Sequence, residues 1–244
     1  MPRFFVPSNN ITDEYIRITG SDAAHITRSL RMSVGESVTV CNMKCTEYGC
    51  VIDGFENGDV VLKIVSSSPG KTEPPYKVTV FQALPKGDKM ETIVQKTVET
   101  GAYKVVPFIS ERCISRPDGK SRVSKVERWN KIAFEAAKQC GRGIIPEVGE
   151  ILAFNQMLEC ARTADTAILF YEGDGTVPLN RILEKVSPQS SISVIIGSEG
   201  GFSLEEVSAA RSDGILIAGL GPRILRCETA PTVALSAISY ALEL

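Results

Sequence analysis

The chain has 244 residues, a net charge of −2, and hydrophobic and charged fractions of 43% and 23%, which are ordinary for a globular protein of one large or two modest domains. No apolar run reaches the roughly 18 residues of a membrane-spanning helix, and the Pro-interrupted start is too short for a secretory signal, so we expect a cytoplasmic protein with no membrane partner. Seven cysteines and a single histidine fit neither a disulfide framework nor a zinc site, so we expect reduced thiols and no metal.

The first 65 residues have the pattern of short strands separated by turns. We expect strands over 15–19, 37–41, 51–55 and 60–65, and one short helix over 23–30. Asn57-Gly58 between the last two strands predicts a tight hairpin, because this pair tolerates the positive φ angles that such a turn requires. The region is therefore predicted to be a small β-barrel module.

A polar segment rich in Pro and Gly, residues 66–75, follows this module and shows no periodicity. Such a composition is typical of a linker. We therefore predict two domains, over residues 1–70 and 71–244.

Beyond the linker, apolar strands alternate with helical segments. We expect strands over 78–84, 105–109, 166–171, 191–196 and 214–218, and helices over 89–100, 124–140, 179–186, 203–211 and 230–244. This alternation predicts an α/β domain with a mainly parallel sheet that is covered on both faces.

The charge is distributed unevenly along the chain. Residues 71–143 contain 15 Lys and Arg against 8 Asp and Glu, whereas residues 144–244 contain 6 against 13. A concentrated basic stretch attracts a polyanion, with an affinity that falls steeply with salt. On charge alone, nucleic-acid binding and a merely solvated surface are equally open interpretations.

Two loops late in the chain are candidates for a ligand site, because ligands of open α/β sheets bind beyond the carboxyl ends of the strands. Residues 196–203 contain three glycines, which permit close approach of a ligand to main-chain amides. Ser203 and Glu206 form a capping-box pattern that starts the next helix. A simple tight connection is the alternative interpretation of this loop.

Residues 220–230 form the second loop and contain two arginines and a glutamate between an apolar strand and an apolar helix. Glu228 and Thr229 are alternatively explained as caps of that helix. Neither loop has the spacing of a Rossmann fingerprint or a P-loop, which argues against a dinucleotide enzyme and an NTPase of those types.

The segments Ile196–Ser203 and Leu220–Ala230 resemble the two signature loops of the ribosomal RNA small subunit methyltransferase E family. The resemblance extends over nearly the whole chain, through residues 24–32, 86–91, 110–113 and 135–142. Two departures are visible: Ser198 stands where the family usually has Pro, and Cys227 stands where it usually has Thr.

This resemblance implies a PUA-like β-barrel that binds RNA, followed by a SPOUT-type methyltransferase domain with a trefoil knot. It also implies a homodimer, S-adenosylmethionine as cofactor, and methylation of uridine N3 in 16S ribosomal RNA, either free or in the small ribosomal subunit. The residues expected to bind the cofactor are Phe170, Tyr171, Glu172, Ile196, Gly197, Glu199, Gly200, Gly201, Leu220, Gly221, Ile224, Leu225 and Thr229.

Methyl transfer to an imide nitrogen needs alignment and removal of one proton. By location, Glu199 and Glu228 are the candidate bases and Arg226 the candidate group for stabilising the imide anion, although each glutamate is equally well explained as a cap or a loop salt bridge. The candidate contacts to the RNA backbone are Arg3, Arg28, Arg31, Arg112, Arg116, Lys120, Arg122 and Lys125.

Three rival functions stay open at this point. They are a methyltransferase of the same fold that acts on transfer RNA or on a ribose 2′-hydroxyl, a non-catalytic RNA-binding assembly factor, and a small-molecule α/β enzyme.

Overall fold

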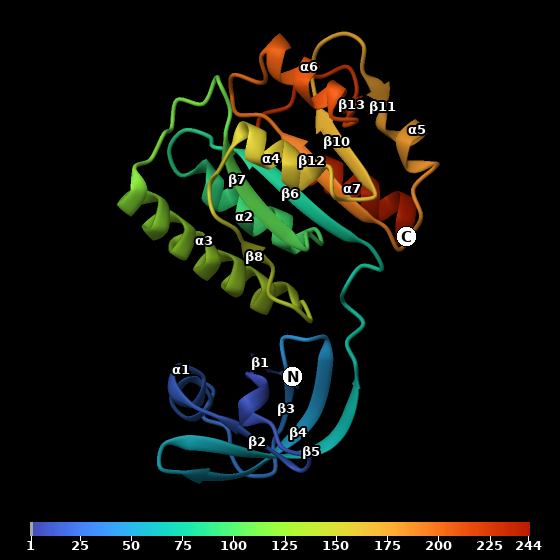
Figure 1. The fold of residues 1–244 in the computed structure, drawn as a ribbon. Coiled ribbons are helices and arrows are strands. Elements are labelled where there is room, and N and C mark those ends of the chain that lie inside the picture. Colours follow the sequence, from blue (N-terminus) through green and yellow to red (C-terminus); the bar gives the residue numbers. More distant parts are fainter. Residues whose placement is uncertain (1) are drawn as a thin grey trace. The chain divides into compact units, whose positions relative to one another are not determined.

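A computed structural model describes residues 2–244 and divides the chain into two compact units (Figure 1). The first contains the chain up to Glu73 together with Ala137–Ile145, and the second contains Pro74–Ala136 and Pro146–Leu244. No helix within residues 2–244 combines the length and the apolar character that crossing a bilayer requires.

The first unit is built on a five-stranded sheet in the order β1-β3-β4-β5-β2. Its elements are β1 (Arg3–Phe5), a 3-10 turn (Ser8–Asn10), β2 (Tyr15–Ile18), α1 (Gly20–Ala24) with a π-helical turn (His25–Ser29), β3 (Ser37–Cys41), β4 (Thr46–Glu56) and β5 (Asp59–Pro69). All neighbours are antiparallel except β1 and β3. Asn57 and Gly58 have φ angles of 52° and 89°, so the predicted hairpin is confirmed.

Strand β5 continues through four residues that the sequence predicts to be linker. Ser66–Pro69 pair with the start of β4, where Thr46 lies opposite Pro69. The prediction was wrong here because the backbone pairs while the side chains stay exposed and polar, so no apolar alternation marks the strand.

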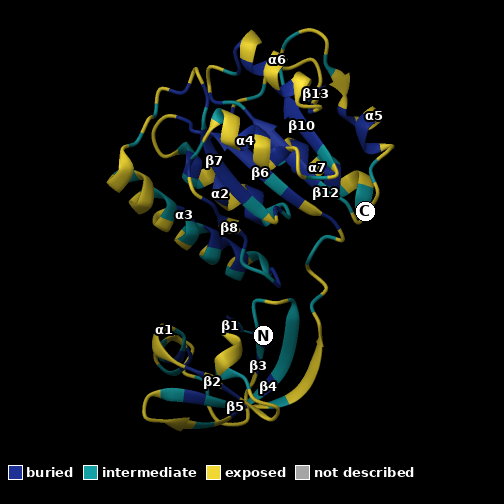
Figure 2. Ribbon diagram, viewed as in Figure 1, coloured by how far each residue is buried: buried dark blue, intermediate teal, exposed yellow. Residues whose placement is uncertain are grey.

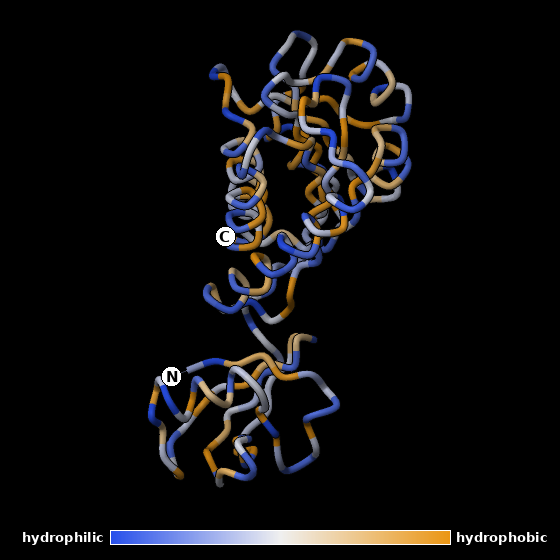
Figure 3. Tube along the Cα trace, turned by 90° about the vertical axis from the view of Figure 1, so that its left-hand side faces the viewer, coloured by the Kyte–Doolittle hydropathy of each residue, from blue (hydrophilic) through white to orange (hydrophobic). Residues whose placement is uncertain are grey.

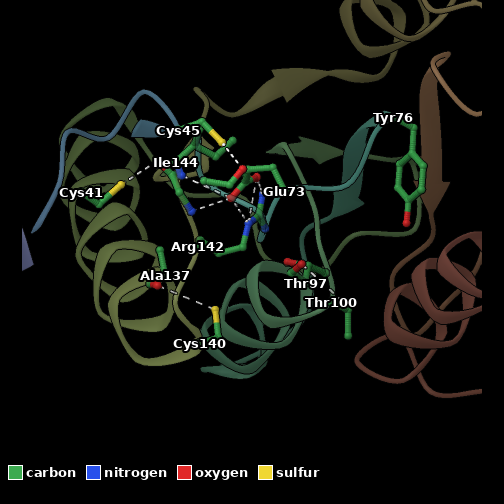
Figure 4. A network of polar contacts seen from close by, with 12 residues as sticks. Cys41, Cys45, Glu73, Tyr76, Thr97, Thr100, Ala137, Cys140, Arg142 and Ile144 are labelled. Atoms are coloured by element: carbon green, nitrogen blue, oxygen red, sulfur yellow. Dashed lines mark hydrogen bonds and ion pairs between the residues drawn. The ribbon is translucent and has the colours of Figure 1, made fainter. Parts of the chain in front are cut away.

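The segment Ala137–Ile145 packs with the first unit, although the predicted boundary assigns it to the second domain. Arg142 explains this placement, because its guanidinium is 4% exposed and lies 2.7 Å from a carboxylate oxygen of Glu73 (Figure 4). Glu73 also accepts hydrogen bonds from the backbone N–H groups of Gly143 and Ile144. An ion pair between residues this far apart in sequence leaves no local pattern.

The second unit is built on one parallel sheet in the order β11-β13-β10-β12-β6-β7-β8, with β9 beside β7. Its strands are β6 (Lys77–Ala83), β7 (Lys104–Ile109), β8 (Glu147–Val148), β9 (Leu152–Ala153), β10 (Thr166–Phe170), β11 (Val177–Pro178), β12 (Ser191–Ile196) and β13 (Leu216–Gly219). Its helices are α2 (Lys89–Glu99), α3 (Gly119–Cys140), α4 (Phe154–Ala161), α5 (Leu179–Leu183), α6 (Leu204–Ser212) and α7 (Ala230–Leu242). The expected α/β class with a parallel sheet is confirmed.

Helices cover both faces of this sheet, with α4 in front of it and α7 behind it in Figure 1. The central strands are buried in Figure 2, and Figure 3 shows hydrophobic and hydrophilic stretches alternating along the chain in both units. Helix α4 was not predicted, although Met157, Leu158 and Ala161 are buried at helical spacing, because eight residues are too few for the pattern to stand out.

Candidate functional site

Four neighbouring parallel strands, β6, β12, β10 and β13, end at the same edge of the sheet. The segments after them enclose a cavity of about 370 Å³, a volume typical of small-molecule and cofactor sites. Both candidate loops contribute to its wall, so the structure brings together two segments that lie about 20 residues apart in sequence.

Most of the predicted cofactor-binding residues line this cavity. They are Phe170, Tyr171, Glu172, Glu199, Gly201, Leu220, Gly221, Ile224 and Leu225, and the candidate catalytic residues Arg226 and Glu228 line it as well.

Four of the predicted cofactor-binding residues do not line the cavity. Ile196 ends β12 with its side chain in the core, at 3% exposure. The carbonyl of Gly197 accepts a hydrogen bond from Gln82 Nε2 at 3.1 Å, and Gly200 faces Arg112, whose Nη1 donates to its carbonyl at 3.0 Å. Thr229 is the exposed N-cap residue of α7.

Gly201 is a residue of the first loop at which a side chain would be strained. Its φ of +63° is a left-handed conformation, and a Cβ atom built there would collide with the carboxylate of Glu172. Its N–H donates to the carbonyl of Ser198 at 3.0 Å, which closes the turn. The glycine therefore leaves room at the cavity wall that a side chain would fill.

The predicted capping box holds this loop to helix α6. Ser203 Oγ accepts from the N–H of Glu206 at 3.3 Å, and the Glu206 carboxylate accepts from the N–H of Ser203 at 3.0 Å. The same carboxylate, on a residue 6% exposed, accepts from the N–H of Glu111 at 2.8 Å. The alternative interpretation of Thr229 as a side-chain cap is not supported, because its side chain makes no capping bond to α7.

Lys89 joins the two loops through their carboxylates. Its Nζ lies 2.7 Å from Glu199 Oε1 in the first loop and 3.8 Å from Glu228 Oε2 in the second. The backbone N–H of Lys86 also donates to Glu199, at 3.2 and 3.3 Å to its two oxygens. The thiol of Cys227 contacts Glu228 Oε2 at 3.2 Å. The ammonium group of Lys89 thus contacts one carboxylate from each loop.

This network shifts the pKa of each of its members. Burial raises the pKa of Glu199, but the hydrogen bond from Lys89 and the backbone donors outweigh it, so the pKa lies below its ordinary value. The pKa of Glu228 is lowered in the same way, against burial, by its backbone donor, the Cys227 thiol and the charges of Lys89 and Arg226. Burial and the contact with Glu228 raise the pKa of Cys227 to about 12. Both carboxylates are therefore ionised at neutral pH.

Several residues of the cavity wall are not among the predicted cofactor-binding and catalytic residues, although the sequence also left Arg223 open for the role given to Arg226. They are Lys89, Thr176, Ser198, Gly219, Pro222, Arg223, Cys227 and Ala230. Lys89 follows β6 directly, so its position at the carboxyl edge of the sheet could have been inferred once β6 was placed beside β12.

The candidate RNA-binding residues differ in their surroundings. Arg3 is ion-paired with Glu47 at 2.7 Å and donates to the carbonyl of Arg142, which favours a structural role. Arg116 donates to three carbonyls of its own loop, those of Ser110, Glu111 and Cys113. Three further arginines are exposed: Arg28, Arg31 and Arg122.

Lys120 and Lys125, near the start of α3, have no ion-pair partner among residues 2–244. Arg112 is exposed as well, but its guanidinium donates to the Gly200 carbonyl. These two lysines, together with the exposed Lys131 on the same helix, are thus basic side chains that make no ion pair among the described residues and are free to meet a polyanion.

Comparison with known proteins assigns the chain to a family. A family model described as an RNA methyltransferase domain matches residues 72–239. The ribosomal RNA small subunit methyltransferase E of Bacillus subtilis is 35% identical over 100% of this chain and 98% of its own length. The chain belongs to the ribosomal RNA small subunit methyltransferase E family.

Solved structures of relatives agree over the full length. A ribosomal RNA small subunit methyltransferase E from Neisseria gonorrhoeae, bound to S-adenosylmethionine, is 28% identical with a TM-score of 0.84, and the match covers 98% of this chain and 97% of that one. A methyltransferase from Legionella pneumophila in complex with the same cofactor is 31% identical with a TM-score of 0.84 and the same coverage.

The residues of the cavity fit such a cofactor. Gly201 leaves space at the wall, and the buried hydroxyl of Ser198 makes no hydrogen bond within residues 2–244. The apolar side chains of Leu220 and Leu225 and the carboxylate of Glu172 line the same cavity. It therefore offers both apolar and polar surface, as an adenosyl group with an amino-acid tail requires.

Proposed function

We propose that this protein, an S-adenosylmethionine-dependent methyltransferase of small-subunit ribosomal RNA by its family, methylates N3 of one unpaired uridine in 16S ribosomal RNA. The observation that carries this proposal is the meeting of two loops around one cavity, with ionised carboxylates and an arginine at its wall.

Bound S-adenosylmethionine supplies a methyl group that its positively charged sulfur makes electrophilic. The backbone of the loops after β10, β12 and β13 would hold the cofactor, and a carboxylate beside its sulfur would be unfavourable, because an anion there would stabilise the bound reactant more than the transition state. Glycines at positions 201, 219 and 221 let these backbones approach closely.

Glu228 is the better of the two candidate bases. Glu199 is engaged by Lys89 at 2.7 Å and by the N–H of Lys86, whereas Glu228 lies 3.8 Å from Lys89. Its lowered pKa keeps it ionised at neutral pH and ready to accept the N3 proton as the N–CH3 bond forms. Arg226, exposed at the cavity wall, offsets the negative charge on the uracil oxygens.

The RNA must present the base outside a duplex, because pairing hides uridine N3. The first unit, together with Lys120 and Lys125, is proposed to hold the RNA backbone, either of free 16S ribosomal RNA or of the small subunit. This proposal puts the enzyme in the cytoplasm. The trefoil knot and the PUA-like assignment of the first domain stay predictions.

A homodimer is also part of the proposal. Helix α7 buries Ala234, Leu235 and Ile238 but leaves Tyr240 78% exposed, and Val233 and Ala237 border a shallow groove of about 430 Å³. An exposed apolar face of this kind is suited to a second copy of the chain. Sedimentation equilibrium should give twice the monomer mass, and a monomer at micromolar concentration would contradict this part.

Nucleoside mass spectrometry tests the target atom. 16S ribosomal RNA or small subunits from a strain that lacks the enzyme are incubated with the protein and S-adenosylmethionine. We expect a methyl group on the uracil ring at N3. A methyl group on the ribose would instead show a 2′-hydroxyl methyltransferase. Methylation of transfer RNA but not of 16S ribosomal RNA would show a transfer RNA methyltransferase.

A further inference from the structure

We propose that Lys89 is a positioning residue that clamps Glu199 and Glu228 into one ion network and thereby fixes the two loops that form the methyl-donor pocket. The inference deepens the proposed function, because it takes the cavity to be the site of the cofactor. It assigns a role to the segment Lys86–Glu91, which the mechanism has not used so far.

The geometry indicates that the lysine acts on both loops at once. Glu199 follows β12, Glu228 precedes α7, and Lys89 is the first residue of α2. Two carboxylates this close to one ammonium would repel each other without it. With Lys89 present, its Nζ attracts both carboxylates, at 2.7 Å from Glu199 Oε1 and 3.8 Å from Glu228 Oε2, which offsets the repulsion between them.

The start of α2 is a firm support for such a clamp. The N–H of Lys86 donates to the same carboxylate that Lys89 contacts, so Glu199 is held from the backbone as well as from a side chain. Met90, Ile93 and Val94 on the other face of α2 are buried in the core of the unit. The ammonium group is therefore placed by a packed helix rather than by a loop.

The proposed site binds a cofactor with a positively charged sulfur, so a lysine beside it needs an explanation. The ion pairs of Lys89 with the two glutamates provide one. The carboxylates of Glu199, Glu228 and Glu172 line the cavity, and the guanidinium groups of Arg223 and Arg226 are exposed beside it. Lys89 is the cation that directly contacts the carboxylates of both loops, and it is only 34% exposed in its side chain. Its task is thus to hold the wall and not to meet the ligand's charge.

Calorimetry with S-adenosylhomocysteine, the neutral product, measures this role without turnover. We expect Lys89→Met to weaken binding by about fivefold, the loss of roughly one partly exposed ion network. Lys89→Arg keeps the charge and should bind within about twofold of the wild type. Lys96→Met removes a lysine of the same helix that is paired with Glu99 at 2.8 Å on the surface, and it should change nothing.

A double mutant separates this role from general damage to the fold. If Lys89 acts through Glu199, the pair Lys89→Met with Glu199→Gln should lose no more affinity than Lys89→Met alone. Additive losses would show two independent contributions and would overturn the clamp. Thermal unfolding of each variant, followed by circular dichroism, checks that the fold persists, and Glu199→Gln alone still reports on the network if Lys89→Met does not fold.

The pH dependence should differ in sign between the variants. In the wild type the pKa of Glu199 is lowered, so the ion pair persists through neutral pH and is lost as the pH falls through that lowered pKa, which weakens ligand binding. In Lys89→Met the carboxylates repel each other, so protonating one of them on acidification should restore affinity. The groups that face the network are Glu172, Arg226, Cys227 and the backbone of Lys86; the chain's one histidine, His25, lies in the first unit.

The outcomes distinguish the two proposals. A wild-type protein that binds neither S-adenosylmethionine nor S-adenosylhomocysteine overturns the proposed site, and the clamp with it. A wild type that binds, with Lys89→Met binding equally well and losing affinity on acidification in the same way, overturns the clamp alone.

Discussion

At the scale of single residues, the site depends on a few positions where backbone conformation or ionisation restricts the residue type. Gly201 combines a left-handed backbone with a Cβ direction that is blocked by Glu172. Glu228 combines ionisation at neutral pH with a place at the cavity wall. For each of these two residues, a substitution can be tested whose effect on binding or catalysis is distinguishable from a loss of stability.

Gly201→Ala should weaken S-adenosylmethionine binding by more than about tenfold, because the added methyl group must displace Glu172 in addition to straining the backbone. Gly214→Ala is the matched control: it also has a positive φ, 79°, but nothing lies within 4 Å of a Cβ there. The control should lose about 1 kcal/mol of stability and keep its affinity. Equal affinities for both variants in calorimetry would refute the blocked-wall argument.

Glu228→Gln should lower the rate constant of methyl transfer by about 10²-fold to 10⁴-fold, the usual contribution of a general base, with a much smaller effect on cofactor affinity. In the wild type the activity should persist as the pH falls past the ordinary glutamate pKa, because the pKa of Glu228 is lowered. Single-turnover kinetics across pH measures both effects. A rate unchanged in Glu228→Gln would transfer the role of base to another group.

At the scale of secondary structure, the start of helix α6 organises the first loop. Ser203 and Glu206 cap the helix, and the same Glu206 carboxylate binds the N–H of Glu111 after β7. The capping box is visible in the sequence, whereas its link to Glu111 is not, because that partner lies 95 residues away.

Glu206→Ala should lower the free energy of unfolding by about 1–3 kcal/mol, since it leaves the buried N–H of Ser203 and the partly buried N–H of Glu111 without an acceptor. Glu205→Ala changes the neighbouring residue of the same helix, which is exposed, and should cost less than about 0.5 kcal/mol. Urea unfolding of both variants provides the comparison. Equal losses would mean that the carboxylate contributes no more than a surface charge does.

At the scale of the whole molecule, an ion pair in the first unit joins distant parts of the chain, and lysines of α3 offer positive charge to a partner. The pair between Arg142 and Glu73 brings residues 137–145 to the sheet of the first unit (Figure 4). Lys120 and Lys125 of α3 supply charge without an ion-pair partner among the described residues, whereas Arg128 of the same helix is paired with Glu91.

Arg142→Met should destabilise the protein by about 3 kcal/mol, because it leaves the largely buried Glu73 carboxylate, 15% exposed, without its cation. Arg17→Met removes a surface arginine of the same unit, 46% exposed and paired with Glu56, and should cost much less, because solvent screens an exposed ion pair. Chemical denaturation distinguishes the two. A loss for Arg142→Met as small as that of the surface variant would show that the pair does not hold the segment.

Replacing Lys120 and Lys125 together by Ala should weaken RNA binding uniformly and lower the slope of log affinity against log salt by roughly 1.4, or about 0.7 for each lost phosphate contact to a single strand. Cofactor affinity should stay unchanged. Salt titrations of fluorescent RNA binding measure the slope. If cofactor and RNA affinities fall by the same factor, the separation of the two binding functions is wrong.

Local patterns in the sequence determined most of the elements and the two loops. The hairpin at Asn57-Gly58, the α/β alternation and the capping box at Ser203 each depend on a few consecutive residues, so the sequence alone predicted them. The family resemblance rested on the same two loops. These features are local, and local backbone preferences decide them.

Only the tertiary structure decided which side chains meet. Lys89 reaches Glu199 and Glu228 because β6 lies beside β12 in the sheet, and Arg142 reaches Glu73 across a sequence separation of 69 residues. Ile196, which packs in the core, and the glycines at 197 and 200 are not among the residues that line the cavity. Contacts of this kind depend on strand order and burial, which bring distant residues together without leaving a periodic or local trace in the sequence.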